Sequence, residues 1–503
     1  MPTKKNFTIT TPTTIVIFGV TGDLAQKKLL PALFDLHRRG VLPSKFHIVG
    51  FARREWSDEQ FREFATTVLK HDRHHHTARE LTAFLRKLTY ARGNFDTLAD
   101  YQTLKRRLVE LDKKFGQNIC SNKLLHLAVP PEYYPVIFKN LSHSGLSIAC
   151  VGEGEGWTRL LVEKPFGRDS ATARNMDAQL GALFDESQIF RIDHYLAKET
   201  IQNILTFRFS NSIFEPVWNA RYVERVEIEL FEAESVAHRI NFFDGVGELR
   251  DVVQSHALQM LALVAMEQPQ GMGSAAIRRE RERVMRSLAL PAAGTLLDTV
   301  VRAQYRGYAD DVKNAPAPLP SGKTASQTET FVQIKTQLKS RRWRGVPFYI
   351  TAGKALHRSK VKIKVYFKQT KGCFNCPAGP HEHPRNLLVF RIQPQEGIAV
   401  HFWAKRPGFK NEMVSKELRF DYHEFSDAAA SLAGSRRERI PDAYETLLFR
   451  AMRGEQTNFA SSRELAASWR YITAVLKHWK QVPLQTYQKG GKGPKNLLLK
   501  INN

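Results

Sequence analysis

The chain has 503 residues, of which 42% are hydrophobic, and its 75 lysines and arginines against 50 acidic residues give a formal net charge of +25. This length exceeds what one hydrophobic core usually organises, so it predicts two domains, or three. The composition is that of a soluble globular protein. It excludes a disulfide-built scaffold and, because no run of about 18 apolar residues occurs, a membrane-spanning helix.

The positive charge favours anionic partners, which include a phosphorylated substrate with a nucleotide, a nucleic acid or an acidic surface. The basic residues are dispersed, as in LHRRG and LKSRRWRG, and accompany no RNA-binding signature or zinc-finger spacing. We therefore expect neither a nucleic-acid partner nor a membrane. With four cysteines and no apolar segment near residue 1, the sequence predicts a protein of the reducing cytoplasm.

The first elements alternate between strand and helix. A buried strand over 15–18 is followed by a glycine turn, an amphipathic helix that carries Leu29 and Leu33, and a second strand near 46–54. Further apolar strands are expected at 124–129 and 158–166. This order predicts an α/β fold, a Rossmann-like coenzyme domain over residues 1–195.

The turn GVTGDLA lies where backbone N–H groups approach a pyrophosphate, although two glycines three apart are also compatible with an ordinary tight turn. Arg53 and Arg54 end the second strand, where an NAD-binding fold places an acidic residue. Cations there favour NADP over NAD, unless they are merely solvated. The candidate coenzyme residues of the turn are Gly19, Thr21, Gly22, Asp23 and Leu24.

The segment RIDHYLAKE, residues 191–199, concentrates polar side chains at one point of the chain. The apolar spacing that follows predicts a helix that begins near His194 with Asp193 as its N-cap. A helix N-terminus with a histidine, Tyr195 and Lys198 is suited to hold a phosphate. A solvated, charged first turn is the alternative.

From about residue 207 the pattern changes to longer alternating strands with helices between them. This predicts an α+β domain over residues 196–503 with a broad, mostly antiparallel sheet. The expected strands are 225–234, 329–339, 362–368, 387–394 and 398–405, and the expected helices are 250–266, 441–454 and 464–479. His256 lies on an apolar face of the first of these helices, so the pattern alone favours a histidine of the core.

Two segments have the residue types of a metal site. Cys373, Cys376, His381 and His383 in CFNCPAGPHEH could ligate zinc, or the cysteines could be reduced thiols of a hairpin loop. The histidines near residue 75 lack enclosing ligands and predict a solvated loop. We assign no metal ligands from the sequence.

In order along the chain stand GVTGDLAQKK, EKPFG, RIDHYLAKE, RDVVQSHALQ, VPFYITAGKAL and PDAYETLLF. Together they resemble the glucose-6-phosphate dehydrogenase family over nearly the whole length. The resemblance implies oxidation of glucose 6-phosphate at C1 to 6-phospho-D-glucono-1,5-lactone with NADP, the first step of the oxidative pentose phosphate pathway. It also implies a homodimer or homotetramer.

The resemblance assigns roles by position. It makes His256 the general base and Asp193 the carboxylate that orients it, and it places Lys164 between sugar and nicotinamide, before a cis proline at Pro165. The family's phosphate clamp corresponds to His194, Tyr195 and Lys198, and its sugar-binding residues to Glu232, Asp251 and Lys354.

Some positions depart from the family pattern. Ala197 and Ser255 are small changes near the site, whereas FEAESVAHR differs enough to put the role of Glu232 in question. Thr351 stands where members with a second, structural NADP have arginine, so we do not predict that site. Two alternatives to the family's activity are a sugar dehydrogenase of another family and a basic binding or regulatory protein on an inactive dehydrogenase scaffold.

Overall fold

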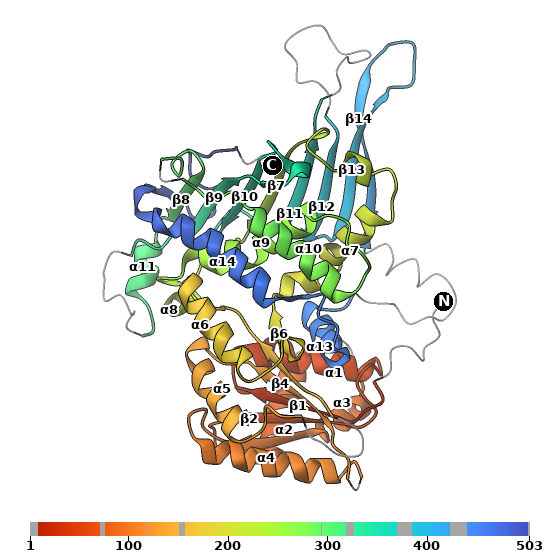
Figure 1. Cartoon of the computed structure of the whole chain (residues 1–503), viewed down its shortest axis with the longest axis vertical. Coiled ribbons are helices and arrows are strands. Elements are labelled where there is room, and N and C mark those ends of the chain that lie inside the picture. Colours follow the sequence, from red (N-terminus) through yellow and green to blue (C-terminus); the bar gives the residue numbers. More distant parts are fainter. Residues whose placement is uncertain are drawn as a thin grey trace.

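The computed structural model describes residues 9–70, 76–116, 118–149, 156–292, 294–317, 326–369, 385–422 and 440–500. Two sheets organise these residues, one in the first part of the chain and a larger one in the second (Figure 1). Several helices lie between the two sheets and against one face of the larger (Figure 1).

The first sheet has seven strands in the order β15-β6-β5-β4-β1-β2-β3. All pairs are parallel except that of β15 with β6. Strand β1 pairs with β2 on one side and with β4 on the other, so the strand order reverses at β1. The strands are β1 Thr13–Phe18, β2 Phe46–Ala52, β3 Leu88–Arg92, β4 Asn122–Leu127, β5 Thr158–Val162, β6 Ile189–Ile192 and β15 Phe459–Ala460.

Helices connect and cover the first sheet, as the alternation of apolar strands with amphipathic segments predicts. They are the π-helix η2 Ala25–Leu29 and the α-helices α1 Leu30–Arg38, α2 Asp58–Lys70, α3 Ala78–Leu85, α4 Leu98–Lys113, α5 Tyr134–His143, α6 Ser170–Gly181 and α13 Ala443–Arg453. Both α13 and β15 come from the second part of the chain, and Leu447 and Phe459 pack into the core of the first sheet.

The second sheet has nine strands in the order β14-β13-β12-β11-β7-β10-β9-β8-β16. Only the β7–β10 and β8–β16 pairs are parallel. The strands are β7 Val223–Phe231, β8 Val300–Tyr305, β9 Phe331–Thr336, β10 Phe348–Gly353, β11 Lys360–Phe367, β12 Leu387–Gln393, β13 Gly397–Lys405, β14 Met413–Asp421 and β16 Leu484–Tyr487.

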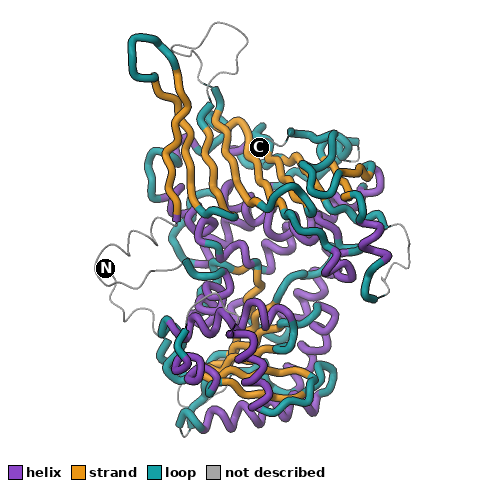
Figure 2. Tube along the Cα trace, turned by 180° about the vertical axis from the view of Figure 1, so that it is seen from behind, coloured by secondary structure: helices purple, strands orange, loops and turns teal. Residues whose placement is uncertain are grey.

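Helices lie against one face of this sheet, and Figure 2 shows its strands from the opposite side. They are α7 Glu199–Phe209, α8 Ile240–Phe243, the π-helix η8 Leu249–Ala257, α9 Leu258–Ala265, α10 Ser274–Ser287, α11 Tyr308–Lys313 and α14 Ser462–Lys477. The 3-10 turns are η3 Pro131–Tyr133, η4 Glu186–Gln188, η5 His194–Ala197, η6 Glu215–Val217, η7 Ala237–Arg239, η9 Arg341–Trp343 and η10 Trp479–Gln481.

The fold class expected from the sequence is confirmed: a Rossmann-like sheet precedes a larger, mostly antiparallel sheet. The sequence pattern did not reveal α10, in which several arginines and glutamates are buried, nor did it reveal the strands β8, β10, β14 and β16. Among the described residues no helix is both long enough and apolar enough to cross a membrane.

Candidate active site

Asp193 follows β6 directly, at the carboxyl end of the first sheet. Its Oδ1 accepts the backbone N–H of Tyr195 at 3.1 Å, so it caps the 3-10 turn η5. The α-helix α7 begins only at Glu199, because Lys198 has an extended backbone with φ −70° and ψ 138°. The predicted capping role of Asp193 is therefore confirmed, but the predicted α-helix start near His194 is wrong by one short turn.

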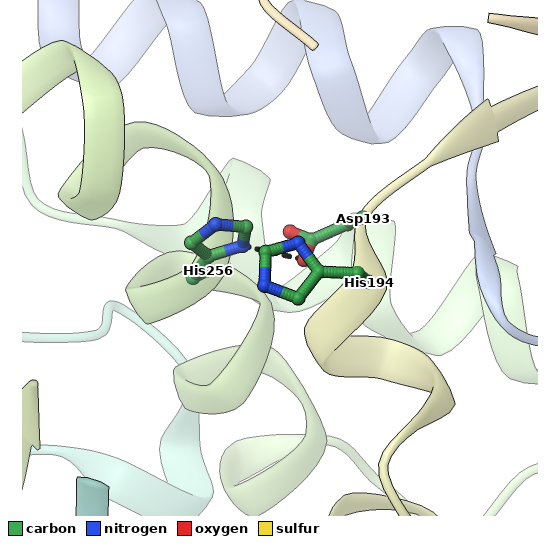
Figure 3. Close-up of side chains that lie close together, drawn as sticks. All are labelled: Asp193, His194 and His256. Carbon is green, nitrogen blue, oxygen red and sulfur yellow. Dashed lines mark hydrogen bonds and ion pairs between the residues drawn. The ribbon is translucent and has the colours of Figure 1, made fainter. Parts of the chain in front are cut away.

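His256 lies on η8, which has π-helical geometry and leads into α9. Such local widening of a helix is frequent at functional sites. The side chain is buried, at 3% exposure, as the apolar pattern around it predicts. Its Nδ1 lies 2.5 Å from Oδ1 of Asp193 (Figure 3), so the sequence motifs around 193 and 256 meet at one point.

The electrostatics of this pair favour a neutral imidazole beside an ionised carboxylate. Burial lowers the pKa of His256 below its ordinary value, and Lys164 adds to this effect although Asp193 opposes it. Burial alone disfavours the carboxylate, but the neighbouring His256, His194 and Lys164 lower the pKa of Asp193 to about 2. Near neutral pH, the Nδ1–H of His256 donates to Asp193 and Nε2 is left to accept a proton.

Lys164 follows β5, and its peptide bond to Pro165 is cis, as the resemblance implies. Its Nζ lies 3.0 Å from Nε2 of His256. The same ammonium donates to the backbone oxygen of Asp251 at 2.8 Å and to the Asp251 carboxylate at 3.1 Å. Lys164 therefore joins the coenzyme sheet to the element that carries the histidine.

Asp251 lies one helical turn before His256 and is the centre of a charged cluster. Its carboxylate pairs with Lys164, with Arg239 at 3.0 Å and with Lys354 at 3.9 Å. These cations lower the pKa of Asp251 well below its usual range although burial acts to raise it. Lys354 also pairs with Glu232.

Two members of this cluster, Arg239 and Glu248, are not predicted from the sequence. Arg239 stands in the segment that departs from the family pattern, and Glu248 belongs to no motif quoted above. Glu248 lies 3.7 Å from the ammonium of Lys354. No spacing rule would have selected either residue, because both reach the site through tertiary packing.

The predicted phosphate clamp lies beside the histidine. The ring of Tyr195 is 4.3 Å from that of His256 between centroids, and the ring of His194 is 4.7 Å from it. The ammonium of Lys198 lies 5.4 Å from the centroid of the Tyr195 ring. Within the described part of the chain the ammonium of Lys198 forms no hydrogen bond or ion pair, so its charge is available to an anion.

The coenzyme turn lies at the carboxyl end of β1, where the strand order reverses. Gly19 has φ +79°, and a Cβ there would lie 2.5 Å from the backbone oxygen of Ala128. Its N–H donates to Phe51 at the end of β2, and the N–H of Gly22 donates back to Gly19. Only glycine fits this close packing of strand ends, which is the geometry that a dinucleotide pyrophosphate requires.

The remaining coenzyme candidates surround this turn. Thr21 has its backbone oxygen bound by the side chain of Gln26, and Asp23 pairs with Lys27 on the exposed surface. Arg53 is exposed in the bend after β2 and, among the described residues, has no hydrogen-bonding or ionic partner. A free guanidinium next to the turn fits the 2′-phosphate of NADP.

One group of three potential metal ligands occurs in the described ranges. The ligand atoms of Asp193, His194 and His256 lie within 4.8 Å of one another. Asp193 and His256 instead form the hydrogen bond drawn in Figure 3, and Lys164 places a positive charge at the other histidine nitrogen. The zinc candidates Cys373, Cys376, His381 and His383 lie outside the described residues.

Comparison with known proteins agrees with this geometry. Residues 16–203 match the model of the glucose-6-phosphate dehydrogenase NAD binding domain, and residues 205–502 match that of the C-terminal domain of the same enzyme. The chain belongs to the glucose-6-phosphate dehydrogenase family. This confirms the resemblance drawn from the sequence and excludes a sugar dehydrogenase of another family.

Relatives of this dehydrogenase align over nearly its full length. A glucose-6-phosphate 1-dehydrogenase of Chlamydia pneumoniae is 36% identical and spans 96% of this chain and 93% of the relative. An Arabidopsis thaliana glucose-6-phosphate 1-dehydrogenase 6, described as cytoplasmic, is 37% identical over 96% of this chain and 89% of its own.

Solved structures show the same fold. A glucose-6-phosphate dehydrogenase in complex with glucose 6-phosphate superimposes with a TM-score of 0.85 at 32% identity and covers 97% of this chain and 96% of its own. An enzyme from Mycobacterium avium does so with a TM-score of 0.78 at 29% identity, over 96% and 95% of the two chains. This dehydrogenase is accordingly an NADP-dependent oxidoreductase.

Proposed function

We propose that this chain oxidises C1 of D-glucose 6-phosphate to the 6-phospho-1,5-lactone with His256 as the general base. The observation that carries the proposal is the buried hydrogen bond between His256 and Asp193, with Lys164 at the opposite ring nitrogen. Oxidation of a hydroxyl needs a neutral base within hydrogen-bond reach, and this pair supplies one.

In the proposed mechanism the C1 hydroxyl binds at Nε2 of His256. Nε2 takes the hydroxyl proton as the carbonyl of the lactone forms, while Asp193 retains its bond to Nδ1 and stabilises the imidazolium. The chemistry that NADP supplies when bound is acceptance of the hydride from C1. Lys164 lies between the two reacting partners and fixes the position of the oxygen by donating to it.

The phosphate end of the substrate is assigned to His194, Tyr195 and Lys198. All three follow Asp193 in one turn, so phosphate binding and base orientation depend on the same segment. Burial lowers the pKa of His194, which leaves it a neutral hydrogen-bonding group, and Lys198 supplies the charge. Binding energy at this remote group positions C1 against the base.

The sugar hydroxyls are assigned to Glu232, Asp251 and Lys354, whose carboxylates and ammonium can accept from and donate to hydroxyl groups. The coenzyme is assigned to the turn from Gly19 to Leu24, to Arg53 and to Lys164. The close approach of strand ends at Gly19 supports this assignment.

Two further features extend the proposal to the whole chain. We place the boundary between coenzyme and substrate domains near residue 195. The family matches that meet between 203 and 205 support this boundary, although α13 and β15 return to the first sheet.

We also infer a homodimer or homotetramer. The edge strand β14 and its neighbour β13 extend beyond the other strands in Figure 1, and they expose Leu418 and Trp403, respectively. Light scattering measures the molar mass in solution and so the number of chains in the assembly.

A cytoplasmic location is supported by the relative described as cytoplasmic. Fractionation of cells that produce the protein, with activity measured in each fraction, tests this location.

The test of the proposed activity is the initial rate of NADP reduction with glucose 6-phosphate, beside NAD and a His256→Asn variant. We expect a fast NADP-dependent rate that falls about a hundredfold or more in the variant, because a positioned base contributes at least that much. The inactive-scaffold alternative is favoured instead if folded wild-type protein binds the sugar phosphate but reduces neither coenzyme.

A further inference from the structure

Glu248 is a buried acidic residue that the mechanism above does not use. It immediately precedes η8, and its side chain is fully buried, at 0% exposure. Neither carboxylate oxygen has a hydrogen-bond partner among the described residues. A buried carboxylate without hydrogen bonds destabilises the folded state. Stability of the fold therefore does not account for its presence.

The one ion pair of this carboxylate in the described structure is with Lys354, at 3.7 Å. The ammonium of Lys354 is itself buried and also faces Glu232 and Asp251. Burial disfavours the charged lysine, but the three carboxylates raise its pKa above the ordinary value. Lys354 is thus held as a cation by three acids, two of which are assigned to the sugar.

The three acids differ in what they can do when substrate binds. Glu232 is the most exposed of them, with 44% of its side chain accessible, and is free to turn to a sugar hydroxyl. Asp251 already binds Lys164 and Arg239. Glu248 is anchored at the start of η8, where its backbone N–H donates to Glu329 at 3.1 Å.

We propose that Glu248 is a positioning residue for Lys354, holding its ammonium toward the sugar when Glu232 turns to the substrate. The inference rests on the substrate role proposed above for Lys354. Because η8 also carries Asp251 and His256, Glu248 fixes the lysine relative to the base. Glu248 itself touches neither sugar nor coenzyme in this assignment.

Titration of Glu248 gives the proposal a measurable signature. Burial raises the pKa of Glu248 to about 8; Lys354 and Arg239 oppose the shift, and Glu232 and Asp251 add to it. The nearby phenols of Tyr195 and Tyr487 have raised pKa values and stay neutral in this range. Glu329, whose backbone accepts from Glu248, is a buried acid with a raised pKa of its own. Between pH 7 and 9 Glu248 gains its negative charge and holds Lys354 more strongly.

The experiment is a double-substitution cycle with Glu248→Gln and Lys354→Met, read as KM for glucose 6-phosphate at pH 8.5. We expect Glu248→Gln to raise this KM about tenfold in the wild-type background and less than twofold in the Lys354→Met background. kcat and the KM for NADP stay within about twofold of wild type. The wild-type KM falls between pH 7 and 9, and this dependence is lost in Glu248→Gln.

A matched control is Glu329→Gln, a buried acid that accepts from Leu249 and has no ion pair with Lys354 among the described residues. We expect Glu329→Gln to leave the KM for glucose 6-phosphate within about twofold of the wild-type value. Additive KM effects of the two substitutions, or an unchanged KM in Glu248→Gln, overturn the proposal. Glu248→Met is the second variant, since an apolar side chain of similar size removes the buried charge without a cavity. If neither variant folds, Glu248 is a structural residue and the proposal is wrong.

The cycle separates this proposal from the proposed function. If wild-type protein shows no activity, the function has failed, and calorimetric binding of glucose 6-phosphate replaces KM in the same cycle. If Lys354→Met leaves both KM and binding unchanged, the substrate role of Lys354 has failed, and with it the positioning role of Glu248.

Discussion

Nδ1 of His256 and Oδ1 of Asp193 are 2.5 Å apart, although the residues are separated by 63 positions in the chain. Asp193 ends a strand of the coenzyme sheet, and His256 belongs to a helix that packs on the second sheet. The proposed general base and the carboxylate proposed to orient it therefore come from the two sides of the proposed domain boundary. Packing between these parts fixes the geometry of the pair before substrate binds.

Replacing Asp193 by asparagine tests the orienting role. The amide retains the size of the side chain but offers an NH2 group where a carboxylate accepted the Nδ1–H bond, so the wrong imidazole tautomer is stabilised. We expect kcat to fall about a hundredfold or more, with the KM for glucose 6-phosphate changed much less. Steady-state kinetics measures both. A kcat within about threefold of wild type would show that His256 needs no partner.

Lys198 tests how the remote phosphate contributes to turnover. Lys198→Gln removes the charge of the ammonium but retains a polar side chain only one atom shorter. We expect kcat/KM for glucose 6-phosphate to fall about a hundredfold, since a charge-assisted contact contributes on the order of 1.5–3 kcal/mol. Activity on unphosphorylated glucose, which lacks the group, is the control and stays near the wild-type value. An equal loss on both sugars would place Lys198 outside the phosphate site.

Arg53 tests coenzyme selectivity. Arg53→Gln leaves the turn at Gly19 intact but removes the cation assigned to the 2′-phosphate, so we expect the KM for NADP to rise about tenfold or more while that for NAD stays unchanged. Arg54→Gln is the control on the same bend, because Arg54 instead stacks on the ring of Trp56 at 5.2 Å. Equal effects of the two substitutions contradict the assignment.

Local periodicity was enough to predict most of the fold. Alternating apolar and polar residues predicted strands of the second sheet, because such strands bury one face. The apolar run before Gly19 predicted the first strand of the first sheet. β15 could not be predicted, since two residues carry no periodicity and their pairing with β6 depends on the return of the chain. The α-helix was predicted to begin near His194 because of the apolar spacing that follows it. That spacing does not reveal the extended backbone of Lys198, which separates η5 from α7.

Candidate site residues could be predicted from the sequence where they belong to a recognisable motif, but not where they reach the site only through tertiary packing. Asp193 and His194 are adjacent in one motif, and His256 was assigned through a second motif even though its apolar neighbours favoured a core position. Arg239 and Glu248 were missed because their relevance depends on distances to Asp251 and Lys354 that no sequence spacing encodes.

The protonation of His256 gives a prediction that needs no substrate. Burial and Lys164 together lower its pKa below the ordinary value of 6.5. The folded state binds this proton less readily than the unfolded chain does, so protonation of His256 opposes folding only as the pH falls below about 6.5. An NMR titration of the imidazole, assigned by its absence in His256→Asn, is expected to give a midpoint below 6.5. A midpoint above 7 would mean that attraction by Asp193 outweighs burial.

A buried ion pair between α10 and α14 gives a prediction on stability. Nε of Arg281 lies 2.7 Å from Glu464, both side chains are almost fully buried, and the guanidinium also donates to the backbone of Phe459 in β15. Arg281→Gln removes the closer of the two guanidinium groups that pair with the buried carboxylate of Glu464 and leaves only Arg278, at 4.0 Å. We therefore expect a loss of about 3 kcal/mol in the free energy of unfolding. Lys27→Gln, which breaks the exposed ion pair with Asp23, costs about 1 kcal/mol or less. Urea denaturation compares the two variants, and equal losses would show that Arg281 adds nothing specific to the packing of β15 and α14.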